Sequence, residues 1–338
     1  MEVFEMNSNE EELQRILDND PHKPVNSLSA YLEPTLPDYL WKFVAFEDFI
    51  CANGLIAFEE SRLKKDELEA KRGFQFGVSY FEHRIIRIRE VLKDRGYITE
   101  ENLQAEVKKQ MSHFEKNRKK PAHPLQLEVL AMINLTLGNS MMMSKAFQHH
   151  YEQVRGRTPI TGAKIVAKAW VDPDFKALLR VDPKMAIYGW EPSVIHAEDK
   201  DIIDPNGLVI LENTEELRHV VVCTLCSCYP RELLGEPPMW YISKEYKERI
   251  VNEPRKYLAD YGLKLGDKTE LRVYDTTADI HYMVLPMRPD GSEDLSEEEL
   301  SLLVTRDSLL GLGDPLSPKL LPQLRESIKE KGHLLSYP

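Results

Sequence analysis

Three of the four cysteines in the chain lie within six residues, in the segment CTLCSC at residues 223–228. Cys223 and Cys226 form a C-x-x-C step, and Cys226 and Cys228 form a C-x-C step. In a C-x-C chelate, both sulfurs and the intervening backbone nitrogens can point at one metal ion. Three thiolates with the amide nitrogens of Ser227 and Cys228 would suit a strongly Lewis-acidic octahedral ion, such as Co(III) or Fe(III). The position opposite Cys223 would then be open to water or substrate.

Residues 223–228 are here called the cysteine claw. Their spacing alone is compatible with other interpretations. A structural zinc site prefers four tetrahedral side-chain ligands, usually from two separated pairs. His219 could be the fourth ligand, although it lies in an apolar run that is typical of a strand. A redox pair of Cys223 and Cys226 would leave Cys228 unexplained and belongs to a different βαβ context. The three residues could also be buried thiols without a shared role.

Composition restricts the class of protein around the claw. A chain of 338 residues exceeds what one hydrophobic core usually serves, so two domains are expected. The net charge of −12 argues against nucleic acid and anionic membranes as partners. No apolar run approaches the roughly 20 residues of a membrane helix, and the acidic start has no features of a secretory signal. These features predict a cytoplasmic protein.

Hydrophobic periodicity predicts an α+β fold, with a helical N-terminal domain followed by a layered α/β domain. Helical patterns end at Gly54 and Gly96, and a helix pair is split at residues 172–173. Ser243 is expected to cap one helix, and Ser296 with Glu299 to form a capping box. Strands are predicted at residues 208–211, 219–223, 270–274 and 281–285. The predicted divisions are a flexible arm (1–25), a helical domain (26–113), a linker (114–124), the metal-binding domain (125–318) and a C-terminal tail (319–338).

The claw and its surroundings resemble the metal-binding α-type subunit of nitrile hydratases and the corresponding subunit of thiocyanate hydrolase. The likeness covers about residues 163–311 and includes AKAWVDPDFK, LENT, VVVCTLCSCYP, LLGEPPMWY and RVYDTTADIHYMVLPMRPDGSE. The resemblance implies metal-dependent hydration of a C≡N group, from nitrile to amide. Thiocyanate hydrolysis to carbonyl sulfide and ammonia is the first alternative. A non-catalytic cobalt carrier or activator for a related hydratase is the second.

The same resemblance implies unequal roles for the claw residues. Cys223 would remain a thiolate, Cys226 would be oxidised to the sulfinate and Cys228 to the sulfenate, which would act in catalysis. Ser227 would supply a metal-bound amide nitrogen and a hydroxyl that orients the oxidised sulfurs. Thr224 matches the cobalt-type signature, so Co(III) is expected rather than Fe(III).

Residues 38–110 resemble the N-terminal helical part of the β-type subunit of the same enzymes, so the chain is predicted to fuse parts of two subunits. Arg62 aligns with an arginine that hydrogen-bonds the oxidised cysteines in the family, and its guanidinium would suit two sulfur oxygens. An exposed helix arginine is an equal alternative. The C-terminal barrel of the β-type subunit has no counterpart here. We therefore expect a separate barrel subunit and a hetero-oligomer.

Three further residues are predicted to form the substrate pocket. Arg231 follows Tyr229-Pro230, where many nitrile hydratases carry an aromatic residue, and a cation would suit anionic thiocyanate. Arg231 could instead pair with Glu232 or Glu236. Trp240 and Tyr241 would provide an aromatic wall compatible with neutral nitriles.

Overall fold

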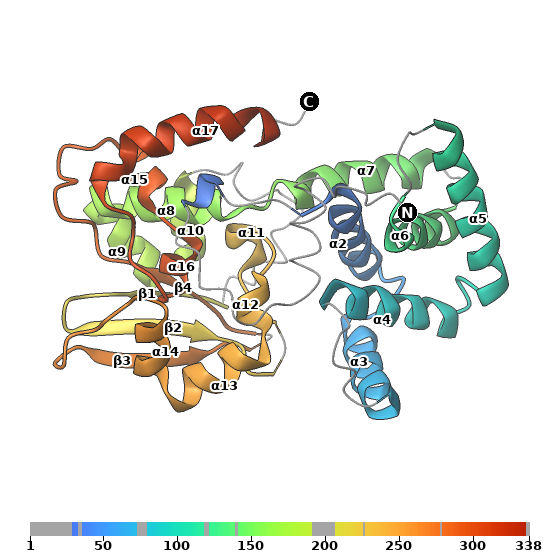
Figure 1. The fold of residues 1–338 in the computed structure, drawn as a ribbon, viewed down its shortest axis with the longest axis horizontal. Coiled ribbons are helices and arrows are strands. Elements are labelled where there is room, and N and C mark those ends of the chain that lie inside the picture. Colours follow the sequence, from blue (N-terminus) through green and yellow to red (C-terminus); the bar gives the residue numbers. More distant parts are fainter. Residues whose placement is uncertain are drawn as a thin grey trace, which may run out of the picture. The chain divides into compact units, whose positions relative to one another are not determined.

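Residues 29–32, 36–72, 80–117, 122–138, 141–190, 207–225, 227–277 and 279–335 are described by the structure, which is a computed structural model. The chain divides into two compact units (Figure 1). The first contains residues 1–20 and 35–156, and the second contains residues 21–34 and 157–338. The predicted α+β fold is confirmed. The regular elements in the described part of the first unit are all helices, and all described strands lie in the second unit.

The first unit is built around an apolar helix, α2 (Asp38–Ala52), which is buried on most of its surface. The buried ion pair between Glu47 of this helix and Arg84 measures 2.6 Å, and Arg87 contacts the other carboxylate oxygen at 2.7 Å. These two arginines hold the pKa of Glu47 below its usual value against the opposing effect of burial. The other helices are α3 (Phe58–Arg72), α4 (Tyr80–Asp94), α5 (Glu100–Asn117), α6 (Pro124–Leu137) and α7 (Met141–Arg155).

The unit boundary differs from the predicted linker at residues 114–124. Helix α5 continues to Asn117, and α6 begins at Pro124. Helices α6 and α7 then contribute Met132 and Phe147 to the same core as Phe46 of α2. Because these apolar faces are buried against α2, the compact unit extends to Gly156.

The second unit contains two pairs of parallel strands, β1 (Leu208–Glu212) with β4 (His281–Leu285), and β2 (Leu217–Val222) with β3 (Glu270–Asp275). All four coincide with predicted strands to within two residues. The remaining elements are η1 (Ala30–Leu32), α8 (Pro159–Val171), α9 (Pro173–Val181), α10 (Pro183–Trp190), α11 (Arg231–Leu234), α12 (Met239–Ile242), α13 (Lys244–Asn252), α14 (Pro254–Asp260), α15 (Glu297–Leu303), α16 (Arg306–Leu309), η3 (Pro318–Leu320) and α17 (Leu321–Leu335).

Local capping signals fix several helix starts in this unit. Asp172 caps α9, accepting a hydrogen bond from the Phe175 backbone at 2.9 Å. Ser243 caps α13, and Ser296 with Glu299 forms the expected capping box at α15. In each case a side-chain oxygen satisfies a backbone N–H that the first helical turn leaves without a partner.

Candidate metal centre

The claw begins where β2 ends, and strand pairing fixes its first residues. Cys223 directly follows β2, and its side chain is completely buried. Val222 lies opposite Asp275 in the parallel pairing of β2 and β3. The backbone N–H of Thr224 donates to Asp275 Oδ1 at 3.0 Å, and the Thr224 hydroxyl donates to Oδ2 at 2.5 Å. The Asp275 carboxylate therefore holds the chain immediately after Cys223.

The other end of the claw is fixed through the backbone carbonyl of Cys228. The hydroxyls of Tyr241 and Thr276 both donate to this oxygen, each at 3.0 Å. Tyr241 is completely buried, and burial raises its pKa well above the usual value, so the hydroxyl stays protonated and remains a donor. A second buried tyrosine, Tyr246, donates to the Val221 carbonyl at 2.5 Å. Hydroxyls thus hold the chain on both sides of the claw.

Arg231 lies beside the middle of the claw, with its charge balanced by a carboxylate. It is the first residue of α11, and its Nη2 donates to Ser227 Oγ at 3.3 Å. Its Nη1 contacts the Glu236 carboxylate at 2.6 and 2.5 Å. Glu236 is buried, and Arg231 is partly buried. The pKa of nearby His281 is lowered by burial and, secondarily, by the Arg231 charge. The region beside Ser227 therefore carries a neutralised ion pair.

Predicted site residues lie in both units. Cys223, Ser227, Cys228, Arg231, Trp240 and Tyr241 belong to the second unit, whereas Arg62 lies on α3 of the first. Arg62 is half exposed and pairs with Glu59 and, at 3.6 Å, with Asp66 on the same helix. Its contact with oxidised cysteines stays a prediction. Cys226 lies outside the described residues.

The two aromatic residues of the predicted pocket wall differ in the structure. Trp240 is partly buried and packs edge-to-face on Tyr246, with ring centroids 5.0 Å apart. Tyr241 has no exposed surface, because its ring packs against Tyr229 and its hydroxyl reaches the Cys228 carbonyl. It supports the claw backbone rather than facing an open pocket.

His219 is not arranged as a fourth claw ligand. Its backbone N–H and its Nδ1 lie 2.9 and 3.1 Å from Asn213 Oδ1, and burial lowers its pKa. It precedes Cys223 by four residues of chain, about 13 Å along an extended strand. Within the described ranges, which omit Cys226, no three His, Cys, Asp or Glu residues are grouped as a metal site.

Three residues around the claw were missed from the sequence: Asp275, Thr276 and Tyr246. Asp275 is the last residue of β3 and lies opposite Val222, the last residue of β2, and Thr276 follows directly. A sequence signal existed, since polar residues directly after a strand are typical of site positions, but the pairing of these two strands was not predictable.

None of the helices in the described ranges is long and apolar enough to cross a membrane.

The second half of the chain is similar to subunits of known enzymes. The family model described as "Nitrile hydratase, alpha chain" matches residues 123–313. A nitrile hydratase subunit alpha from Rhodococcus sp is 46% identical over 169 residues, covering 50% of this chain and 80% of the relative. The low-molecular weight cobalt-containing nitrile hydratase subunit alpha of Rhodococcus rhodochrous is 42% identical, covering 56% and 88%. Thiocyanate hydrolase subunit gamma of Thiobacillus thioparus is 35% identical, covering 55% and 78%.

Proposed function

The chain belongs to the nitrile hydratase α-chain family, and on this basis we propose that it hydrates nitriles to amides at a Co(III) centre. The claw residues Cys223, Cys226, Ser227 and Cys228 would hold the metal. The observation that carries the proposal is the burial of Cys223 at the end of β2, next to a backbone anchored at Thr224 and Cys228. Cobalt is supported by the name of the Rhodococcus rhodochrous relative and by Thr224.

The donor set of the claw fits such a metal. Thiolates bind cobalt and iron strongly. Deprotonated backbone amides would add nitrogen ligands to an octahedral ion only when the chain is held in position. Asp275 restrains the chain before the claw's C-x-C step, and Tyr241 with Thr276 restrains it after that step. Hydrogen bonds of this kind orient metal ligands without touching the metal. When bound, Co(III) would supply a Lewis acid that polarises the C≡N group.

The chain's own residues would then orient the reacting groups and accept a proton. Cys226 as a sulfinate and Cys228 as a sulfenate would present oxygens beside Ser227. The sulfenate oxygen of Cys228 would accept a proton from the attacking water. The water oxygen adds to the nitrile carbon and both of its protons end on nitrogen, which gives the amide. Arg231 would orient Ser227 through the 3.3 Å hydrogen bond. Arg62 would contact the oxidised sulfurs.

Thiocyanate hydrolysis is the second candidate, favoured by the Thiobacillus thioparus relative and by the cation at Arg231. That cation is paired with the buried carboxylate of Glu236. A paired cation attracts an anion less strongly than a lone one, since the two charges largely cancel at a distance. The pair therefore favours a neutral nitrile. A separate barrel subunit of the β type is proposed as the partner in a hetero-oligomer.

The test uses the full chain purified with the chains that accompany it. We expect cobalt by elemental analysis, two added oxygens on Cys226 and one on Cys228 in the claw peptide, and amide from a nitrile. Cys228→Ser should abolish turnover, whereas Cys51→Ser, a thiol of the first unit's core, should not. Full activity of Cys228→Ser would contradict the mechanism. Ammonia and carbonyl sulfide from thiocyanate alone would establish the second candidate, and cobalt without any turnover would indicate a carrier.

A further inference from the structure

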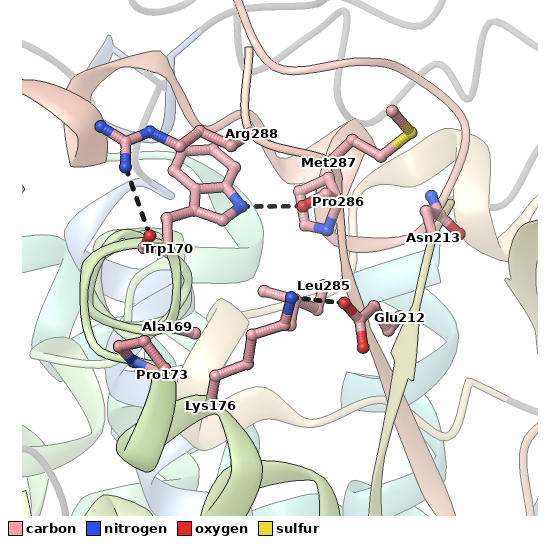
Figure 2. Close-up of a pocket in the computed structure, with 10 residues that line it drawn as sticks. All are labelled: Ala169, Trp170, Pro173, Lys176, Glu212, Asn213, Leu285, Pro286, Met287 and Arg288. Carbon is pink, nitrogen blue, oxygen red and sulfur yellow. Dashed lines mark hydrogen bonds and ion pairs between the residues drawn. The ribbon is translucent and has the colours of Figure 1, made fainter. Parts of the chain in front are cut away.

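A pocket of about 400 Å³ lies in the second unit, at the carboxyl ends of β1 and β4 (Figure 2). This volume is within the range of small-molecule sites. Trp170, Pro286 and Met287 give it an apolar lining, and Lys176, Glu212 and Asn213 add polar groups. It is separate from the claw, which follows the carboxyl end of β2.

Asn213 carries a buried donor that has no acceptor. Its side chain is 3% exposed, and its Oδ1 accepts from the His219 backbone N–H at 2.9 Å. Because a backbone N–H can only donate, this contact fixes which end of the amide is oxygen. The amide nitrogen, Nδ2, is then buried and makes no hydrogen bond with any residue of the described ranges. Buried donors are nearly always paired in native proteins, so this nitrogen indicates a missing acceptor.

The charged residues that line the pocket are two cations, Lys176 and Arg288, and one carboxylate, Glu212. Lys176 Nζ contacts one oxygen of Glu212 at 2.5 Å, and Arg180 contacts the other at 3.2 Å. Two cations therefore surround one carboxylate. An ammonium group has three donors, so Lys176 can bind a further acceptor while it keeps Glu212. Figure 2 shows its ammonium group in the middle of the lining residues.

Trp170 is held in place as the apolar side of the pocket. Its Nε1 donates to the Pro286 carbonyl at 2.8 Å, and Arg288 Nη1 donates to the Trp170 carbonyl at 3.3 Å. Figure 2 shows the Arg288 guanidinium on the far side of the indole from Asn213. The other guanidinium nitrogens of Arg288 donate to Ser292 and the Glu293 carbonyl, so Lys176 is the cation left for a ligand.

We propose that this pocket binds a small carboxylate with an apolar or aromatic body. The carboxylate would accept hydrogen bonds from Asn213 Nδ2 and Lys176 Nζ, and the body would lie on Trp170 and Met287. This site is independent of the chemistry proposed for the claw, so its test does not depend on turnover.

The test is calorimetric titration of the full chain with benzoate, with benzamide as the neutral analogue. We expect saturable binding of benzoate and much weaker binding of benzamide. Asn213→Asp keeps the acceptor for His219, removes the donor and adds a negative charge that repels a carboxylate, and Lys176→Gln removes the positive charge. Each should weaken benzoate binding about tenfold, as expected for a hydrogen bond to a charged group. Lys164→Gln, an exposed change on α8 outside the pocket, should leave binding unchanged.

Three results would overturn the proposal. These are the absence of saturable benzoate binding, equal binding of benzamide, and unaltered benzoate affinity in both pocket variants. Circular dichroism of each variant establishes that a loss of binding is not a loss of fold. Lys176→Gln keeps the test decisive if Asn213→Asp fails to fold.

Discussion

The hydroxyls of Tyr241 and Thr276 offer a direct measure of how the protein holds its claw. Both donate to the Cys228 carbonyl at 3.0 Å. One such bond contributes about 1 kcal/mol to stability, and a buried acceptor that loses its donors costs about 1–3 kcal/mol. Tyr241→Phe or Thr276→Val should therefore each lower the free energy of unfolding by about 1 kcal/mol. The double variant should lose more than the sum, because either hydroxyl alone can partly serve the carbonyl.

Urea unfolding of the four proteins measures this coupling, and cobalt content with kcat per bound cobalt reports on the claw itself. We expect the double variant to lose kcat per cobalt, and Thr276→Ser, which keeps the hydroxyl, to retain it. Tyr39→Phe is the control, since its buried hydroxyl has no hydrogen-bond partner among the described residues. If the double variant matched the wild type in stability, cobalt content and kcat, these hydroxyls would not position the claw.

Two further changes test the surroundings of the claw. Glu236→Gln leaves the Arg231 charge without its carboxylate, so kcat/KM for thiocyanate relative to a nitrile should rise roughly tenfold, which corresponds to about 1.4 kcal/mol. Steady-state kinetics with both substrates measures this ratio. Glu248→Gln, a change at an exposed residue, should leave the ratio unchanged. An unchanged ratio in an active Glu236→Gln protein would refute the role of the Arg231–Glu236 pair. Gly311→Ala places a Cβ 1.8 Å from the His219 carbonyl oxygen at a φ of +84° and should cost more than about 3 kcal/mol in thermal unfolding. Gly291→Ala, at φ +73° in open space, should cost only about 1 kcal/mol, and equal losses for the two would contradict the close approach.

Features that depend on neighbouring residues were determined by the sequence. The claw is visible because three thiols occur within six residues. The caps at Ser243 and Ser296 were predicted correctly because a capping side chain bonds a backbone N–H two or three residues away. The pairing of Arg231 with Glu236, five residues apart, was one of the alternatives that the sequence raised, and the structure has it.

Tertiary structure alone decided which distant residues meet the claw. Asp275 lies 51 residues after Thr224, and Thr276 lies 48 residues after Cys228. Only the parallel pairing of β2 with β3 brings these residues together. Sequence periodicity marks a strand but not its partner or register, because any strand offers the same backbone donors and acceptors. Tyr241 was expected beside the substrate, yet packing turned its ring into the core and its hydroxyl onto the Cys228 carbonyl. The spacing of the thiols therefore indicates a metal site, and the fold supplies the residues that hold it.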